Sequence, residues 1–376
     1  MNGLVVWDTP DNGGSSMKRR MRLSAIVCAV LLVLSMAACS STVPEGSSSV
    51  SPSSTAEDTS LASEIPEPEE TPEAVSSEPI SSVPIEEPSV PIVYMTTDIS
   101  PEGLMAIYEA LNREATGNVA VKISTGEPGS HYLDANLIAD LVQSVDGTIV
   151  ECNTAYGGSR ASTAYHMQLA ADHGYTAIAD VDIMDANGSV SLSVEGGIRL
   201  TENLVGESYE DYDFFIILSH FKGHRMGGFG GAIKNMSVGI ASSAGKCLIH
   251  SAGASTTDRM LNTTPQDDFL EAMAEAAKSV ADDMGENILY INVMNHLSVD
   301  CDCIAYGAEP SMEDIGILAS LDPVALDQAC VDLVYAAPDG ADLIERMESR
   351  NAIHALEHAD AIGFGSREYE LVTIDE

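Results

Sequence analysis

The sequence predicts an α/β domain with a largely parallel, mixed sheet flanked by helices, and three observations support this fold class. Strand signals and helix signals alternate along residues 93–376, as they do when helices connect the strands of a parallel sheet. The segments 212–220 and 288–297 are apolar at most positions, which is typical of strands buried on both faces. Two helices begin with a capping residue followed by proline, which marks where they start.

The first predicted helix covers residues 101–114, because Ser100 is a favourable N-cap and Pro101 fits the first turn. A later helix is expected to stop at Gly174, and the last has Asp322 as its cap. In chain order, the other predicted elements are a strand at 118–124, a helix at 134–145, a strand at 148–153, a helix at 162–174, strands at 212–220 and 288–297, and a helix at 322–335.

Residues 1–38 are interpreted as the signal peptide of a bacterial lipoprotein. From Met17, the expected start of translation, a basic segment, an apolar segment and small residues lead to Cys39, which is expected to be lipidated. A retained membrane-spanning helix is the alternative, and it is disfavoured because the apolar segment 23–38 is short for a span. This interpretation predicts an exported protein that is lipid-anchored to the cell membrane on its extracytoplasmic face.

Residues 39–92 are expected to form a tether, and residues 93–376 a single α/β domain. After Cys39 the tether is rich in Ser, Pro and Glu, with eleven acidic residues and no Lys or Arg. Such a segment cannot bury enough apolar surface to fold, and its charges repel one another. We therefore predict a disordered linker that holds the domain away from the membrane.

The charge of the chain excludes one class of partner. The net charge at pH 7 is -41, and residues 93–376 contain 45 acidic and 13 basic residues. Binding to nucleic acid requires a basic face for the phosphates, so no nucleic-acid partner is expected. The membrane is expected as a partner only through the lipid anchor.

Polar residues follow the ends of four predicted strands. Glu127 and His131 come after the first, and Arg160 comes after the second. The glycine-rich segment 219–246 follows the third, and the segment SVDCDC follows the fourth. Ligands bind at the carboxyl ends of the strands in sheets of this type, so the four segments are expected to converge on a single site.

The segment 219–246 does not match a nucleotide-binding motif. It lacks the third glycine of a dinucleotide fingerprint. Its closest approach to a P-loop has the wrong glycine spacing and ends in Cys247 instead of Ser or Thr. No nucleotide cofactor is therefore supported.

The same segment is cationic in an acidic protein, with three Lys, one Arg, two His and seven Gly, and no Asp or Glu. Glycines allow backbone amides to approach a ligand, while Lys222, Arg225, Lys234 and Lys246 supply positive charge. This combination predicts a small anionic ligand such as a carboxylate or phosphate. The alternative is a connecting loop whose bases pair with neighbouring acids.

Two cysteines and two histidines form a candidate metal site. Cys301 and Cys303 lie two residues apart, and His220 and His224 lie four apart. Thiolates with a histidine ligand suit zinc or iron. The alternatives are a disulfide between the cysteines, reactive free thiols, and histidines that are only hydrogen-bonded.

The remaining cysteines do not suggest a disulfide framework. Residues 93–376 contain five cysteines, an odd number. Cys152 and Cys330 lie in apolar strand and helix patterns, so they are expected in the core.

Two long segments resemble the conserved blocks of domain-of-unknown-function family 362, often described as uncharacterised iron–sulfur-centre proteins. The segments are 219–246 and INVMNHLSVDCDC with the following DIGILASLDPVALDQACVDLV, and the resemblance covers most of residues 93–376. The matching positions are His220, Lys222, His224, Lys234, Asn235, Lys246, Cys301 and Cys303. The resemblance implies a family but no particular reaction.

Many members of this family carry a ferredoxin-like C-x2-C-x2-C-x3-C insert, which binds a four-iron cluster. The corresponding region of this chain, 250–285, contains no cysteine and ends in an alanine-rich helical pattern. A ferredoxin-type cluster is therefore not expected, and a single zinc or iron ion is the predicted cofactor.

Two classes of function fit these residues. The first is a metal-dependent or redox enzyme on a tethered lipoprotein, in which Cys301 and Cys303 bind a metal with His220 or His224. The residues assigned to an anionic substrate are Lys222, Lys234, Asn235, Lys246 and Arg160. The alternative is a non-catalytic, solute-binding surface lipoprotein. A third possibility, a purely structural surface protein, predicts that substitutions at these positions change stability alone.

Overall fold

The computed structural model describes residues 90–375. The predicted signal peptide, the lipidation of Cys39 and the predicted tether up to residue 89 lie outside the described residues. The first described strand begins at Ile92.

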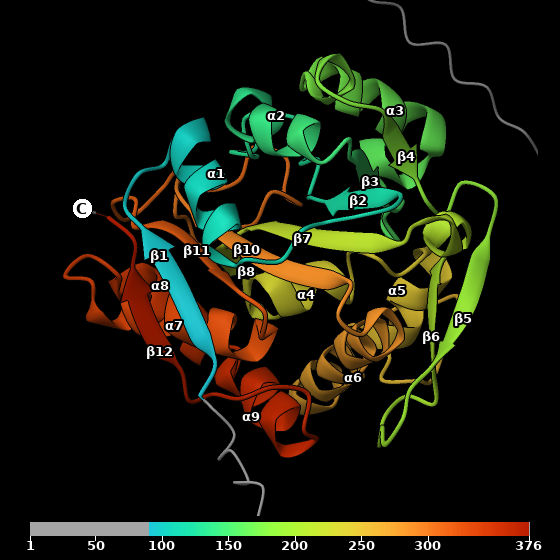
Figure 1. Cartoon of the computed structure of the whole chain (residues 1–376). Coiled ribbons are helices and arrows are strands. Elements are labelled where there is room, and N and C mark those ends of the chain that lie inside the picture. The colour runs from blue at the N-terminus through green and yellow to red at the C-terminus, as the bar shows by residue number, and fades with distance from the viewer. Residues whose placement is uncertain (1–89, 376) are drawn as a thin grey trace, which may run out of the picture. The chain divides into compact units, whose positions relative to one another are not determined.

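An eight-stranded sheet forms the centre of the domain (Figure 1). Only β11 runs antiparallel to its neighbours in this sheet, and the other neighbouring strands are parallel. The predicted fold class, α/β with a largely parallel mixed sheet, is therefore confirmed. The strands in spatial order are β12 (Glu370–Thr373), β1 (Ile92–Thr96), β11 (Gly316–Ser320), β10 (Ile288–Met294), β7 (Phe214–His220), β2 (Val119–Lys122), β3 (Thr148–Glu151) and β4 (Val181–Ile183).

The two central strands β7 and β10 are buried at every position. Successive side chains of a strand point to opposite faces. Accordingly, Ile216 and Leu218 belong to the core on one side of the sheet, and Phe215 and Ile217 to the core on the other. This double burial is the reason why both strands have apolar sequences.

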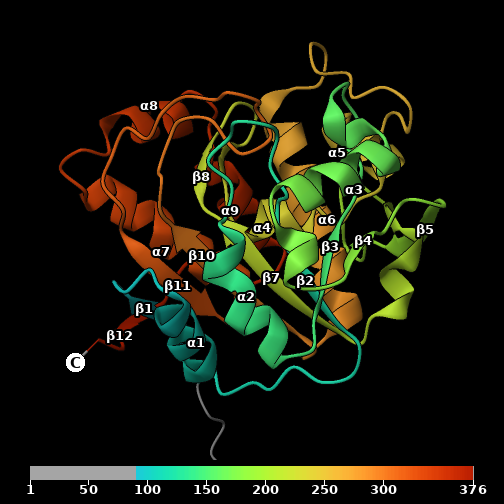
Figure 2. The ribbon, with the colours of Figure 1, turned by 90° about the horizontal axis from the view of Figure 1, so that it is seen from above.

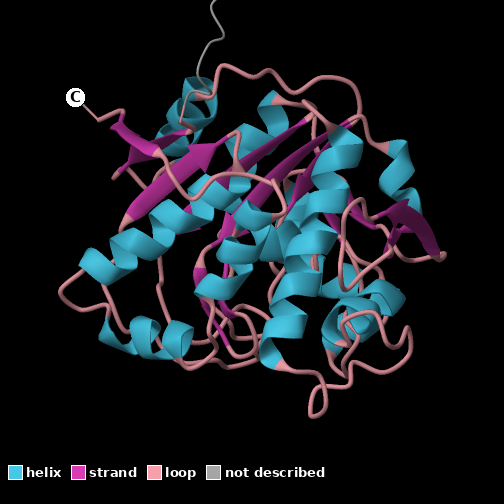
Figure 3. Cartoon of the chain, turned by 90° about the horizontal axis from the view of Figure 1, so that it is seen from below, coloured by secondary structure: helices cyan, strands magenta, loops and turns pink. Residues whose placement is uncertain are grey.

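Helices cover both faces of the sheet (Figures 1 and 2). One face carries α1 (Pro101–Ala110), α2 (Ala135–Ser144) and α3 (Thr163–Asp172). The other carries most of the later helices, which Figure 3 shows from below. Those helices are α4 (Ala232–Met236), α5 (Ser243–His250), α6 (Gln266–Met284), α7 (Pro323–Ala336), α8 (Ala341–Glu348) and α9 (Ile353–Ala361). Within residues 90–375, no helix combines the length and the apolar character that a membrane crossing requires.

The predicted helix starts are confirmed. The side chain of Ser100 accepts a hydrogen bond from the Gly103 amide, and Asp322 accepts from the amides of Val324 and Ala325. The end predicted for the first helix is wrong by four residues. Asn112 has a φ of 47°, a left-handed conformation that stops the helix after Ala110.

The segment 219–246 is not the long loop that its glycines suggested. After β7 it forms a hairpin of β8 (Lys222–His224) and β9 (Gly228–Gly230), followed by α4 and α5. Gly223 permits this arrangement, because a Cβ atom there would lie 2.6 Å from the carbonyl oxygen of Val299. A second small sheet pairs β5 (Ser189–Ser193) with β6 (Glu202–Gly206).

One buried carboxylate fixes the position of α4. Asp327 on α7 accepts hydrogen bonds from the amides of Ala232 and Ile233, at 2.8 and 3.0 Å, and from the side-chain amide of Asn292, at 2.7 Å. Gly231 lets this carboxylate approach, because a Cβ atom there would lie 2.3 Å from Asp327 Oδ1. The short helix is thus connected to both α7 and β10.

Replacing Asp327 with Ala should lower the free energy of unfolding by about 3 kcal/mol, because three buried N–H donors lose their acceptor. Urea denaturation monitored by circular dichroism measures the change. Asp360→Ala, an exposed position on α9, is the matched control and should shift stability by less than about 0.5 kcal/mol. Equal effects of the two substitutions would contradict this role of Asp327.

Candidate functional site

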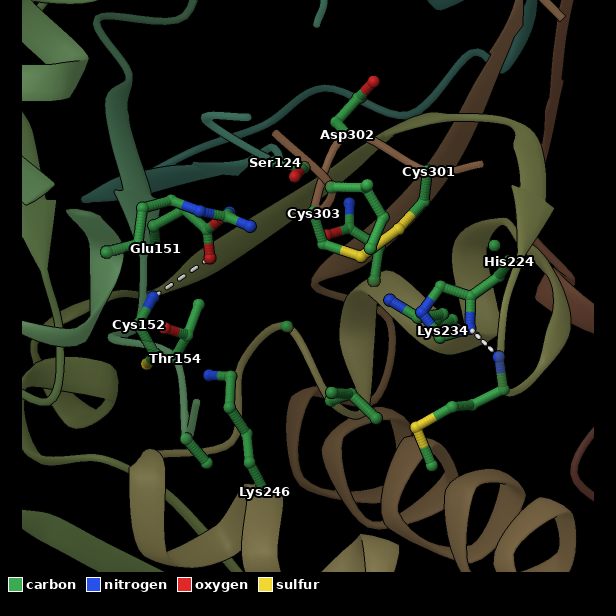
Figure 4. A pocket seen from close by; sticks show the side chains of 18 of the residues that line it. Ser124, Glu151, Cys152, Thr154, His224, Lys234, Lys246, Cys301, Asp302 and Cys303 are labelled. Atoms are coloured by element: carbon green, nitrogen blue, oxygen red, sulfur yellow. Dashed lines mark hydrogen bonds and ion pairs between the residues drawn. A yellow bond between two sulfur atoms is a disulfide. The ribbon is translucent and has the colours of Figure 1, made fainter. Parts of the chain in front are cut away.

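A cavity of about 350 Å³ lies at the carboxyl ends of β2, β3 and β7 (Figure 4). Lys122 and Glu151 are the last residues of β2 and β3, and the parallel register places these strand ends side by side. The β7 end, α4, α5 and the segment 301–304 supply the remaining walls. The predicted convergence of strand ends on one cavity is therefore observed.

Glu151 lies at the centre of a buried network of charges. Its carboxylate accepts from Lys122 Nζ at 3.1 Å and from Arg160 Nη1 at 3.1 Å. Arg160 also donates to Glu127 at 3.1 Å. Burial alone would raise the pKa of Glu151, but the charges of Lys122 and Arg160 outweigh it and lower this pKa to about 2.

Asp302 forms a second network with two residues of the glycine-rich segment. One carboxylate oxygen is 3.0 Å from His220 Nδ1, and the other accepts from Lys222 Nζ at 2.8 Å. Burial by itself would raise the pKa of Asp302, but the charges of and hydrogen bonds from His220 and Lys222 lower it to about 2.

Both ring nitrogens of His220 already have polar partners. Its second ring nitrogen, Nε2, lies 2.8 Å from the carbonyl oxygen of Asn295. A carboxylate oxygen and a carbonyl oxygen thus occupy the positions in front of both ring nitrogens. His220 therefore supports Asp302 and is not positioned as a metal ligand.

His224, Cys301 and Cys303 come close together on another wall. Their potential ligand atoms all lie within 4.8 Å of one another, so the three residues form a possible metal-binding cluster. The two cysteines are joined in a disulfide, one of the alternatives that the sequence left open. A metal could therefore bind to their thiolates only after reduction.

The hydrogen bonds of His224 restrict its use as a ligand. Its Nδ1 accepts from the amides of Met226 and Gly227, at 3.3 and 2.8 Å, so the proton of the neutral ring is on Nε2. Burial and the positive charge of Lys234 lower the pKa of His224 well below its usual value. Metal binding through Nε2 would require this proton to move to Nδ1, at the expense of the two amide hydrogen bonds.

Two lysine side chains on the cavity wall have no acidic partner. Among residues 90–375, no carboxylate lies within ion-pair distance of Lys234 or Lys246. Lys246 donates to the carbonyl oxygen of Ala241 at 2.5 Å. Burial, together with the charges of Lys122 and Arg160, lowers the pKa of Lys234 to about 8. Uncompensated positive charge therefore faces the cavity.

The other predicted anion-binding residues already have partners. Lys222 does not line the cavity, and it is paired with Asp302. Arg225 lines it but forms an ion pair with Asp300. Asn235 lines it, and its side chain accepts from Lys122 and donates to backbone carbonyls and Ser219. Arg160 donates hydrogen bonds to Glu127, Glu151 and Tyr156.

Two residues of the site, Lys122 and Glu151, were not predicted from the sequence. Lys122 and Glu151 each end a strand whose other described positions are mostly apolar, in the segments VAVK and TIVE. A charged residue at the last position of a buried strand was the available signal. Cys152, expected in the core, is buried as predicted and also touches the cavity. Cys330 is buried as well.

Substituting Gln for Glu151 should destabilise the domain at pH 7 and reduce its sensitivity to acid. A pKa lowered from 4.5 to about 2 on folding corresponds to about 3 kcal/mol of stability. That contribution is complete above pH 4.5 and is lost as the pH falls towards 2. Urea denaturation of wild type and variant between pH 7 and 2.5 should show curves that converge at low pH.

Glu345→Gln, at an exposed position of α8, is the control for this experiment. It should leave the pH dependence of the wild type intact. Parallel stability curves for Glu151→Gln and wild type would contradict the assignment of Glu151 as a stabilising carboxylate.

Comparison with known proteins finds similar solved structures and a matching protein family. No protein of curated function matches it. The lactate racemase apoprotein from Thermoanaerobacterium thermosaccharolyticum is a similar solved structure, at 12% identity and a TM-score of 0.37, with 75% of this chain and 82% of that chain covered. A protein from Thermotoga maritima is similar at 13% identity and a TM-score of 0.37, with 69% of this chain and 58% of that chain covered. Similarity at this level does not bear on the chemistry of the cavity.

The family model of DUF362, a domain of unknown function, matches residues 119–332. This range contains β2, β3, β7 and β10 and every charged residue of the cavity described above. The family implied by the residues at 219–246 and 291–334 is thereby confirmed, and the chain belongs to the DUF362 family.

Proposed function

We propose that the cavity binds a small anion with a carboxylate or phosphate group. The observation that carries this proposal is the presence of Lys234 and Lys246 on the wall without a carboxylate partner among the described residues. Charges in a site with restricted water interact more strongly than on the surface. An anion placed between these two ammonium groups would supply the missing counter-charge.

The charge balance of the wall supports the same proposal. Six basic and two acidic side chains line the cavity, in a chain whose net charge is -41. The six bases are Lys122, Arg160, Arg225, Lys234, Lys246 and Arg259, and the two acids are Glu151 and Asp302. A volume of about 350 Å³ suits a small metabolite and not a polymer.

A second candidate function is redox or metal chemistry at the cysteine pair. The proximity of His224 to Cys301 and Cys303 favours it. In the reduced protein, two thiolates and a histidine would offer three ligands to zinc or iron and leave a coordination position open, as in catalytic metal sites. The anion in the cavity would then be the substrate.

We also propose the extracytoplasmic, lipid-anchored location that the N-terminal sequence predicts. A disulfide between Cys301 and Cys303 agrees with an oxidising compartment. A tethered solute-binding protein would need no metal, whereas the enzyme would need the reduced pair. Anion binding is common to both and is therefore the part to test first.

Isothermal titration with phosphate, sulfate and small carboxylic acids should identify at least one ligand of the wild-type protein. Lys234→Gln and Lys246→Gln should each weaken its binding by about 10- to 100-fold, because each removes a charge-assisted contact. Lys278→Gln is the matched control, because Lys278 lies on α6 and pairs with Asp282. Unchanged affinity in both cavity variants would contradict the proposal.

Metal binding should depend on the redox state of the cysteine pair. After reduction with a phosphine and removal of excess reagent, we expect the protein to bind zinc in a 1:1 ratio, measured by elemental analysis. The oxidised protein and the Cys303→Ser variant should retain none. Zinc binding to the oxidised protein, or undiminished binding to Cys303→Ser, would rule out this site.

A further inference from the structure

The lysines of the domain are concentrated at the cavity. Residues 90–375 contain five lysines: three line the cavity, Lys222 pairs with Asp302 of its wall, and Lys278 lies on α6 away from it. Lys122 is paired with Glu151, and Lys222 with Asp302. Lys246 donates to a carbonyl oxygen. The ammonium group of Lys234 has neither a hydrogen-bond acceptor nor an acidic partner among the described residues.

The structure holds Lys234 in place although its amine has no partner. Lys234 lies on α4, whose first turn is fixed by the buried carboxylate of Asp327. The stem of Lys234 lies beside Gly230, where a Cβ atom would be in ordinary van der Waals contact with Lys234 Cδ, at 3.4 Å. Figure 4 shows the side chain in the cavity, near His224 and below the disulfide. A positioned amine that faces a cavity without a counter-ion is suited to act as a nucleophile.

We infer that the Lys234 amine forms an imine with a small anion that carries a carboxylate next to an aldehyde or ketone, that is, a 2-oxo acid. The inference rests on the proposed function, because Lys246 and the neighbouring cations would bind the carboxylate. The carbonyl carbon would then be presented to Lys234.

The reaction balances without an external oxidant or reductant. The nitrogen of neutral Lys234 attacks the carbonyl carbon, a C–N bond forms, and the carbonyl oxygen becomes a hydroxyl group. Loss of this oxygen as water, with the two protons that the amine gives up, completes the C=N bond. The Nε2–H of His224 is the neighbouring group able to donate a hydrogen bond to the departing oxygen.

The environment of Lys234 favours the neutral amine that this reaction requires. Burial and the positive charges of Lys122 and Arg160 lower the pKa of Lys234 to about 8. At pH 7 roughly a tenth of the amine is then unprotonated, far more than for an exposed lysine. Lys122 and Lys222 are instead ion-paired with Glu151 and Asp302, so their amines are not free to attack a ligand.

Borohydride trapping with pyruvate, the simplest 2-oxo ketone acid, tests the inference. After incubation of the full domain with pyruvate, sodium borohydride should convert the imine into a stable secondary amine. Peptide mass spectrometry should then find modification at least about tenfold higher at Lys234 than at Lys278. Lys234→Arg keeps the charge and removes the nucleophile, so it should abolish trapping in the cavity. Labelling of Lys234 and Lys278 to the same extent would overturn the inference.

Propionate, which lacks the ketone, separates this inference from the proposed function. We expect propionate to bind the wild-type protein in isothermal titration and to compete with pyruvate for trapping. Binding of propionate without any trapping of pyruvate would overturn imine formation and leave anion binding standing. Failure of both acids and of all other anions to bind would overturn the two proposals together.

Discussion

The candidate site depends on the buried carboxylate of Glu151. One side chain at the end of β3 accepts from both Lys122 and Arg160 and so joins two strand ends to the segment that follows β3. Moving a charged group from water into the protein interior costs free energy unless a group of opposite charge compensates it. Since this carboxylate compensates Lys122 and Arg160, the positive charge left on the cavity wall for a ligand is that of Lys234, Lys246 and Arg259, which form no ion pair within residues 90–375.

A second buried carboxylate, compensated by basic side chains, organises the other side of the cavity. Asp302 lies between the two cysteines and is held by His220 and Lys222, which fixes the disulfide against the end of β7. The Glu127 amide donates to the Asp302 carbonyl at 2.7 Å and ties the segment after β2 to the same place. Three strand ends are thus joined by polar contacts, while Asp327 positions α4 beneath them. A rigid frame surrounds the only lysine of residues 90–375 that has no partner.

Much of the fold could be predicted from the sequence, because apolar strands and capped helices have local signatures. The four predicted strands are neighbours in the parallel part of the sheet, in the order β10, β7, β2, β3. The edge strand β12, its neighbour β1 and the antiparallel β11 could not be placed, since β1 pairs with two segments that lie more than 200 residues away in the sequence. For the same reason the pairing of Lys222 with Asp302 and of Arg225 with Asp300 was not predictable. Local composition gives the number of charges, but only the fold determines which of them remain uncompensated.

Anomalous diffraction from crystals soaked in selenate tests whether the cavity binds an anion between its unpaired lysines. Selenate is a tetrahedral oxyanion of phosphate-like shape, and its selenium atom can be located without reference to protein density. We expect a selenium peak inside the cavity, with the selenate oxygens within about 4 Å of Nζ of both Lys234 and Lys246. Selenium peaks on the surface with none in the cavity would contradict it.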